Sequence, residues 1–213
     1  MNISGLSLGS LCIIKRPYNL FHRANLYVRT SEVTRSFGNK VTWDKPFAEH
    51  FVAFVQQANL AVFNNDKPCL SLNYDAMKIA DCKYDLVYID TPYINSEGTG
   101  TDYGDFYHFL NGMLDYDQWN ARINKKYKHM PLVGDKDNLW INKTKIYAAF
   151  EGLIAKYRNS VLVISYREDG TPSVSEILGL LKKYKNNVQE VCSRDYKYVL
   201  SQKKSAEVLF IAR

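Results

Sequence analysis

The chain has 213 residues, of which 46% are apolar and 23% charged. This length suits one compact domain, and the composition excludes disordered and fibrous classes. No run of about 18 apolar residues occurs and the first residues do not read as a secretory signal, so the sequence predicts a cytoplasmic protein without a membrane segment. The net charge of +6 is uneven, because residues 1–45 hold seven basic and two acidic side chains. Such a basic first fifth fits a surface that faces a polyanion, and it fits an ordinary solvated surface equally well.

Residues 1–68 are predicted to form a basic region that ends in an amphipathic helix over 46–63. Pro46 suits a first helical position. Apolar side chains then recur at helical spacing and are expected to be buried as a stripe, namely Phe47, Phe51, Phe54, Ala58 and Val62. The turn-forming residues Asn64–Pro68 separate this region from the remainder, 69–213.

The second region alternates between strand and helix signals. The short apolar run 86–89 is typical of a strand buried on both faces of a parallel sheet. Helices are expected near 105–124 and 144–157, followed by a second buried strand at 161–164. A capping box, Ser173–Glu176, predicts the start of another helix. Strands are expected at 188–192, 197–200 and 208–212, the last two as an antiparallel hairpin. The fold class is therefore α/β with a mixed sheet.

The tetrapeptide Asp90-Thr91-Pro92-Tyr93 comes directly after the first buried strand. In open α/β sheets, ligands bind beyond the carboxyl ends of the strands, so these four residues lie where active sites are built. A plain turn at the end of a strand would also use Asp and Pro, because both residues are common in turns.

The tetrapeptide resembles the DPPY signature of adenine-specific amino-methyltransferases, with Thr91 in place of the first proline. Other segments, in chain order, are similar to the Dam-like class of these enzymes: 15–23, 35–40, 73–75, 165–170, 197–201 and 207–209. The resemblance implies a Rossmann-like fold that uses S-adenosylmethionine. It also implies methylation of adenine in a specific DNA sequence, as in restriction-modification systems. Residues 1–68 would then be the target-recognition region, and 69–213 the catalytic part.

The resemblance implies a role for each residue of the tetrapeptide. The exocyclic amine of adenine is a poor nucleophile, and two acceptors for its N–H groups would favour a reactive nitrogen. The Asp90 carboxylate and the Thr91 carbonyl are the expected acceptors, since bonds to a charged group are strong. Tyr93 is expected to stack on a base flipped out of the helix, and Pro92 to stiffen the turn.

The same resemblance implies a role for Asp75 and for the basic region, while Arg167 and Asp169 are interpreted as structural. Asp75 is expected to accept a bond from the adenine amine of S-adenosylmethionine, and capping of a turn is the alternative for it. Arg167 and Asp169 are expected to form a structural ion pair. The four histidines share no metal-ligand spacing, so no metal is expected.

Contacts with double-stranded DNA are expected from the basic region, at Lys15, Arg16, Tyr18, His22, Arg23, Arg35 and Lys40.

The glycine-rich loop with which such enzymes approach the cofactor is not found upstream of Asp90. In the strand order 3-2-1-4-5-7-6 of this family, the chain would supply strands 4 to 7. Its strand at 86–89 would then be an exposed edge that needs a cover. We therefore expect a second subunit that supplies strands 1–3 and the loop. Two alternatives stay open, a non-catalytic DNA-binding remnant of a truncated methyltransferase and an RNA adenine methyltransferase.

Overall fold

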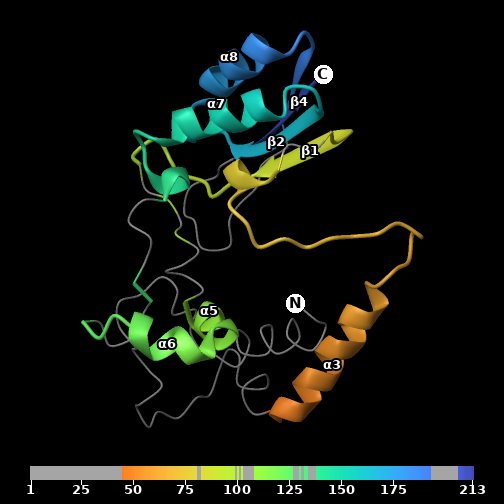
Figure 1. The fold of residues 1–213 in the computed structure, drawn as a ribbon, viewed down its shortest axis with the longest axis vertical. Coiled ribbons are helices and arrows are strands. Elements are labelled where there is room, and N and C mark those ends of the chain that lie inside the picture. Colours follow the sequence, from red (N-terminus) through yellow and green to blue (C-terminus); the bar gives the residue numbers. More distant parts are fainter. Residues whose placement is uncertain are drawn as a thin grey trace. The chain divides into compact units, whose positions relative to one another are not determined.

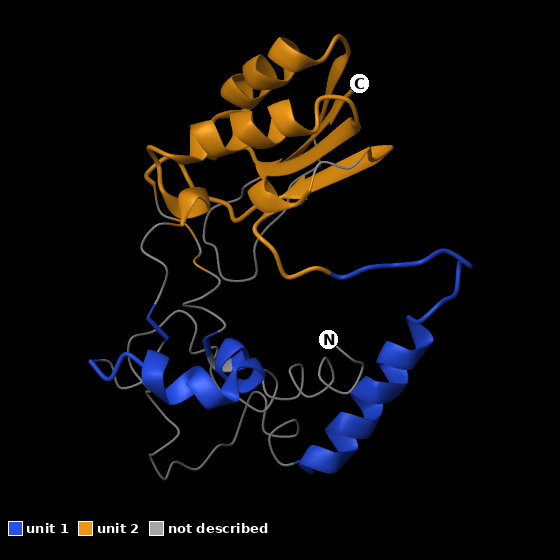
Figure 2. Cartoon of the chain, viewed as in Figure 1, with its two compact units in different colours: residues 1–71, 104–134 blue, residues 72–103, 135–213 orange. Residues whose placement is uncertain are grey.

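The computed structural model describes residues 45–80, 83–98, 100, 102, 108–126, 130, 132–133, 138–192 and 206–213. The chain forms two compact units, residues 1–71 with 104–134 and residues 72–103 with 135–213 (Figure 2). The change of unit at 71/72 lies close to the turn at Asn64–Pro68. The second segment of the first unit, 104–134, lies in the sequence between two parts of the second unit, which the sequence pattern did not predict.

The first unit contains the helices α3 (Phe47–Leu60), α5 (His108–Leu114) and α6 (Tyr116–Arg122). The helix expected over 46–63 is present, but the expected burial of its stripe is wrong, because α3 has no buried residue. Phe47 is 49% exposed, and Val62, which is 63% exposed, lies beyond the end of the helix. Helical spacing defines which face is apolar, but it does not provide a partner for that face. The helical segment near 105–124 is two helices, and α6 packs its Trp119 ring against Gly112 of α5.

The second unit is built on a four-stranded sheet of β1 (Leu86–Asp90), β2 (Val161–Arg167), β3 (Val188–Cys192) and β4 (Glu207–Ala212) (Figure 1). The order is β1-β2-β4-β3, with β1 parallel to β2 and with β4 antiparallel to both of its neighbours. The mixed sheet is thus confirmed, and its order matches the order 4-5-7-6 expected for the last four strands. The terminal antiparallel pair is β3 with β4, instead of 197–200 with 208–212. Residues 197–200 lie outside the described residues.

Two helices, α7 (Ile146–Lys156) and α8 (Val174–Tyr184), pack on one face of this sheet and bury the core beneath them. The capping box that opens α8 is confirmed, with Ser173 and Glu176 each bonded to the backbone of the other. Two short 3₁₀ turns, η2 (Ala76–Lys78) and η3 (Leu139–Ile141), contact α7. The fully buried side chains that join the helices to the sheet include Ile146, Phe150, Ile154, Leu162, Ile164, Tyr166, Ile177, Leu181, Val208 and Phe210.

The strand β1 differs from its expected burial. Only Ile89 is buried, whereas Leu86 is 54% and Tyr88 56% exposed, so the expectation of burial on both faces is wrong. Leu86 and Tyr88 alternate with Ile89, so they lie on the face of the sheet opposite to α7 and α8. In addition, β2 pairs with one edge of β1, and no described strand pairs with the other edge. The expected exposed edge is therefore present in the described part of the chain. None of the described helices is long and apolar enough to cross a membrane.

Candidate active site

Parallel pairing places the tetrapeptide at the carboxyl end of β1, beside the same end of β2. Asp90 is the last residue of β1, and its register partner on β2 is Ser165. The two side chains share one face of the sheet because side chains alternate along each strand. This face is opposite to the one covered by α7 and α8. Two polar groups from neighbouring strands therefore meet at the carboxyl ends of the strands, where open α/β sheets bind ligands.

A hydrogen-bonded group of three side chains lies at these carboxyl ends. The Tyr93 hydroxyl donates to Oδ1 of Asp90 at 2.9 Å, and its oxygen lies 3.1 Å from Oγ of Ser165. Burial raises the pKa of the Tyr93 phenol above its usual range, and the neighbouring Asp90 carboxylate raises it further, whereas the Ser165 bond lowers it. The phenol therefore stays protonated at neutral pH and acts as a donor to Asp90.

The ring of Tyr93 is held by a series of edge-to-face aromatic contacts. It meets Tyr166 at a centroid distance of 5.3 Å, Tyr166 meets Phe150 at 5.2 Å, and Phe150 meets Trp140 at 5.5 Å. The Tyr166 hydroxyl donates to the Thr171 carbonyl, and burial raises the pKa of this phenol to about 12. Edge-to-face pairs of this kind add about 0.5–1.5 kcal/mol each beyond area burial. The site thus rests on the core of the second unit.

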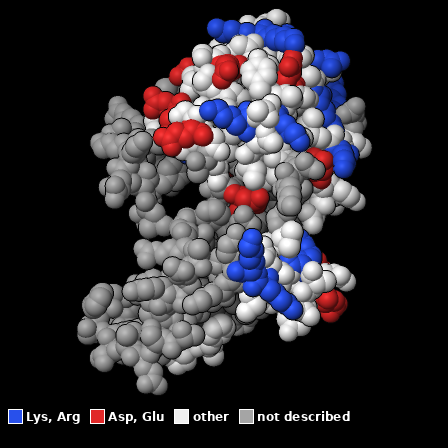
Figure 3. Space-filling model, turned by 90° about the vertical axis from the view of Figure 1, so that its left-hand side faces the viewer, with Lys and Arg blue, Asp and Glu red and all other residues white. Residues whose placement is uncertain are grey.

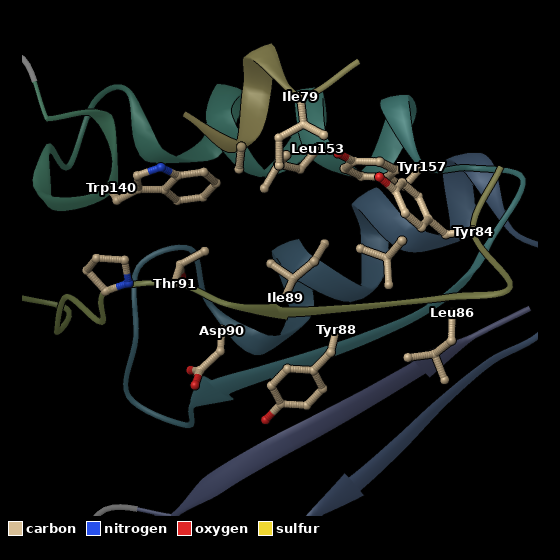
Figure 4. A pocket seen from close by; sticks show the side chains of 13 residues that line it. Ile79, Tyr84, Leu86, Tyr88, Ile89, Asp90, Thr91, Trp140, Leu153 and Tyr157 are labelled. Carbon is tan, nitrogen blue, oxygen red and sulfur yellow. The ribbon is translucent and has the colours of Figure 1, made fainter. Parts of the chain in front are cut away.

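A cavity of about 460 Å³ lies along β1, next to Asp90. It is mostly apolar, and Figure 4 shows Trp140, Tyr157 and Tyr84 on one side of it and β1 on the other. The Thr91 side chain lines the cavity, and its buried hydroxyl has no hydrogen-bond partner among the described residues. A buried hydroxyl without a partner costs about 1–3 kcal/mol. The role expected for Thr91 from the sequence involves its main-chain carbonyl, so it does not account for the unpaired side-chain hydroxyl.

Asp75 is fixed in place by a different set of contacts. Its Oδ1 accepts from the Met77 amide at 2.9 Å and so caps η2, which is the capping role weighed from the sequence. Lys156 of α7 donates to the carbonyls of Met77 and Ile79, the first at 2.8 Å, and thereby pins η2 to the helix. The Asp75 side chain is 48% exposed and does not line the cavity. Its contact with the cofactor stays a prediction.

The other predicted site residues divide into two groups. Arg167 and Asp169 form the expected ion pair, with two bonds of 2.6 and 2.8 Å in a forked geometry. The seven predicted DNA contacts, Lys15 to Lys40, lie outside the described residues. Figure 3 shows both basic and acidic side chains of the described residues on the face that it draws. Ser165 is the residue that sequence reasoning missed as part of the site. The available signal was that each of the two apolar runs, 86–89 and 161–164, is followed directly by a polar residue.

The described glycines do not form a cradle for S-adenosylmethionine. A Cβ added at Gly100 would lie 2.2 Å from Ile94, at Gly152 2.6 Å from Met77, and at Gly170 2.3 Å from Tyr166. These glycines therefore serve internal packing, and none of the described glycines lines the cavity. The described residues alone do not fit the whole cofactor. No group of three or more potential metal ligands occurs among them either.

Comparisons with known proteins find relatives of one kind. The chain is 26% identical over 176 residues to the modification methylase StsI of Streptococcus sanguinis, covering 79% of this chain and 25% of the relative. It is 28% identical over 174 residues to the type II methyltransferase M2.HphI of Haemophilus parahaemolyticus, covering 79% and 46%. It is 29% identical over 143 residues to the type II methyltransferase M.FokI of Planomicrobium okeanokoites, covering 67% and 20%.

No family model matches the chain, and no solved structure matches it. The chain spans between a fifth and a half of the length of these curated relatives. Their shared character, together with the mixed α/β sheet, supports a relation to the methyltransferases of restriction-modification systems.

Proposed function

We propose that this chain is the target-recognition and catalytic part of an adenine-specific DNA methyltransferase of a restriction-modification system. It would transfer a methyl group from S-adenosylmethionine to the exocyclic amine of a flipped adenine in double-stranded DNA. The observation that carries the proposal is the Asp90 carboxylate at the carboxyl end of β1, bonded through one oxygen to Tyr93. The similarity to modification methylases supports it.

The geometry leaves Asp90 able to accept a second bond. An ionised carboxylate has about four acceptor positions on two oxygens, and Tyr93 uses one position on Oδ1. Oδ2 would accept one N–H of the adenine amine, and the carbonyl of Thr91 would accept the other. Both bonds strengthen as the nitrogen becomes positive during methyl transfer, so they stabilise the transition state more than the ground state. The proton leaving the methylated amine would be released toward the Asp90 carboxylate or to water.

The cofactor supplies an electrophilic methyl group when it is bound. Of the described residues, Asp75 is the one we assign to it, as an acceptor for its adenine amine. We propose that a second methyltransferase subunit provides the glycine-rich loop together with strands 1–3. This subunit would add a parallel strand to the open edge of β1, fill the cavity beside Trp140, and offer a partner to the Thr91 hydroxyl.

The DNA would be bound by the basic region, through Lys15, Arg16, Tyr18, His22, Arg23, Arg35 and Lys40. Phosphate contacts by such residues predict an affinity that falls steeply with salt concentration. Flipping of the adenine costs a few kcal/mol of unstacking, which stacking on Tyr93 would partly offset.

Substitution of Asp90 tests the catalytic assignment. We expect Asp90→Ala, in complex with the partner subunit, to lower the incorporation of labelled methyl groups into duplex DNA by at least about 100-fold. DNA binding, followed by fluorescence anisotropy, should persist. Asp117→Ala, at an exposed acid on α6, is the matched control and should leave both unchanged. Equal losses of methylation and DNA binding would contradict the role of Asp90.

The same assay separates the proposal from its alternatives. Methylation of duplex RNA in preference to DNA would favour an RNA methyltransferase, and DNA binding without methylation by any complex would favour a non-catalytic remnant. For the partner, we expect Leu86→Lys and Tyr88→Lys to weaken the complex at least about 10-fold. Leu114→Lys, at a leucine on α5 that is 65% exposed, should not weaken it. Micromolar binding of S-adenosylmethionine to the purified chain alone, by calorimetry, would overturn the two-subunit proposal.

A further inference from the structure

The hydroxyl of Ser165 lies behind the Tyr93–Asp90 pair. Its Oγ is 3.1 Å from the phenol oxygen, and the residue is 8% exposed. A phenol has one proton, and Tyr93 gives it to Oδ1 of Asp90. In this arrangement the Ser165 hydroxyl is therefore the donor to the Tyr93 oxygen. The three groups form a directed chain from Ser165 through Tyr93 to Asp90.

The position of Ser165 in the sheet is unusual for its residue type. It lies within β2, where β-branched and aromatic residues pack best, and its neighbours on the same strand include Ile164 and Tyr166. Its register partners are Asp90 on β1 and Leu209 on β4. A buried hydroxyl needs a hydrogen-bond partner, and Tyr93 is the one the structure provides. The serine therefore has a polar role at the site in addition to any role in packing.

Two anchors fix Tyr93 and leave it little freedom. Tyr166 holds the ring edge-on, and Ser165 holds the hydroxyl. With the phenol so held, the Tyr93 bond to Oδ1 sets the rotation of the Asp90 carboxylate. Bonds that polarise one another in a chain are stronger than separate bonds, and here the chain ends on a charged acceptor.

We propose that Ser165 is a positioning residue, which holds the Tyr93 hydroxyl so that Asp90 keeps Oδ1 occupied and presents Oδ2 to the amine of the substrate base. The inference rests on the proposed function, and it adds a third residue to the acceptor group. Ser165 itself does not touch the substrate. It acts through Tyr93, and its effect disappears when the Tyr93 hydroxyl is absent.

A double-mutant cycle with Tyr93 tests this role in the complex with the partner subunit. We expect Ser165→Ala to lower methyl transfer about 5- to 20-fold, as for the loss of one hydrogen bond in a site. Ser165→Thr, which keeps the hydroxyl, should restore most of the activity. In a Tyr93→Phe background, Ser165→Ala should have less than about a 2-fold further effect. An equal loss in both backgrounds would overturn the proposal.

A spectroscopic readout on the free chain is independent of catalysis. With 3-fluorotyrosine placed at position 93, Ser165→Ala should shift the ¹⁹F resonance, and Ser165→Thr should return it toward its original position. If Ser165→Ala does not fold, Ser165→Cys, which keeps the shape with a weak donor, carries the same expectation. If the complex is active and the resonance does not shift, the role of Ser165 is overturned and the proposed function stands. A wild-type complex that transfers no methyl group overturns the proposed function and, with it, this role.

Discussion

The strands β1 and β2 run side by side, in register over five residue pairs, yet most of β1 is exposed and most of β2 is buried or half-buried. Both are apolar runs that end in polar residues. In β2, Leu162, Ile164, Ser165 and Tyr166 are all buried, whereas in β1 only Ile89 is. Two things differ. Leu86 and Tyr88 lie on the face opposite to α7 and α8, whereas Leu162, Ile164 and Tyr166 lie on the covered face. In addition, β2 lies between two strands, and β1 has one neighbouring strand among the described residues. Local sequence thus determines that a strand forms, and its position in the sheet determines how much of it is buried.

The largest expected effect contrasts the two strands directly. Ile164→Ala removes a side chain that is 1% exposed, so it should lower the free energy of unfolding by about 2–5 kcal/mol. Leu86→Ala removes one that is 54% exposed and should cost less than about 1 kcal/mol in the free chain. Urea unfolding of both variants measures the contrast. Equal penalties would show that β1 is covered in the free chain, and the contrast with β2 would be lost.

A smaller effect concerns the helix that closes the covered side of the sheet. Ser173 accepts from the Glu176 amide at the start of α8, so Ser173→Ala should destabilise the second unit by about 1 kcal/mol. Ser173→Thr keeps an acceptor oxygen and serves as the control. The unfolding midpoint in urea reports the change. A penalty for Ser173→Thr as large as that for Ser173→Ala would point to packing in place of capping.

The smallest effect is a dependence on pH from the same cap. The Ser173 amide donates to Glu176 at 2.7 Å, and this bond lowers the pKa of the Glu176 carboxyl. A carboxyl whose pKa is lower in the folded chain stabilises it above the ordinary glutamate pKa of about 4.3, and this stability is lost as the pH falls through the folded value. We therefore expect the stability difference between wild type and Glu176→Gln to shrink from pH 6 to pH 3. A stability difference that stays constant from pH 6 to pH 3 would show that the charge of Glu176 does not contribute to the cap.

Much of the second unit could be predicted from the sequence because its signals are local. The capping box at Ser173, the apolar runs at 86–89 and 161–164 and the helix at 144–157 each depend on neighbouring residues, and the structure has all of them. Burial of β1 could not be predicted, because it depends on which strands are adjacent and on which face of the sheet the helices cover. The same holds for Ser165, whose contact with Tyr93 spans 72 residues of sequence. The stripe of α3 has the right spacing, but spacing does not supply the partner that would bury it.

The order in which the chain visits its two units has a consequence for cleavage. Residues 104–134 belong to the first unit but lie between two segments of the second, so the backbone passes from one unit to the other three times, at 71/72, 103/104 and 134/135. The stretch between α3 and η2 includes exposed apolar residues such as Phe63 and Leu70, which an endoprotease can reach. A single cut there would break the covalent link between the α3 portion of the first unit and the rest of the chain. The fragment with α5 and α6 would stay covalently joined to the sheet at both of its ends.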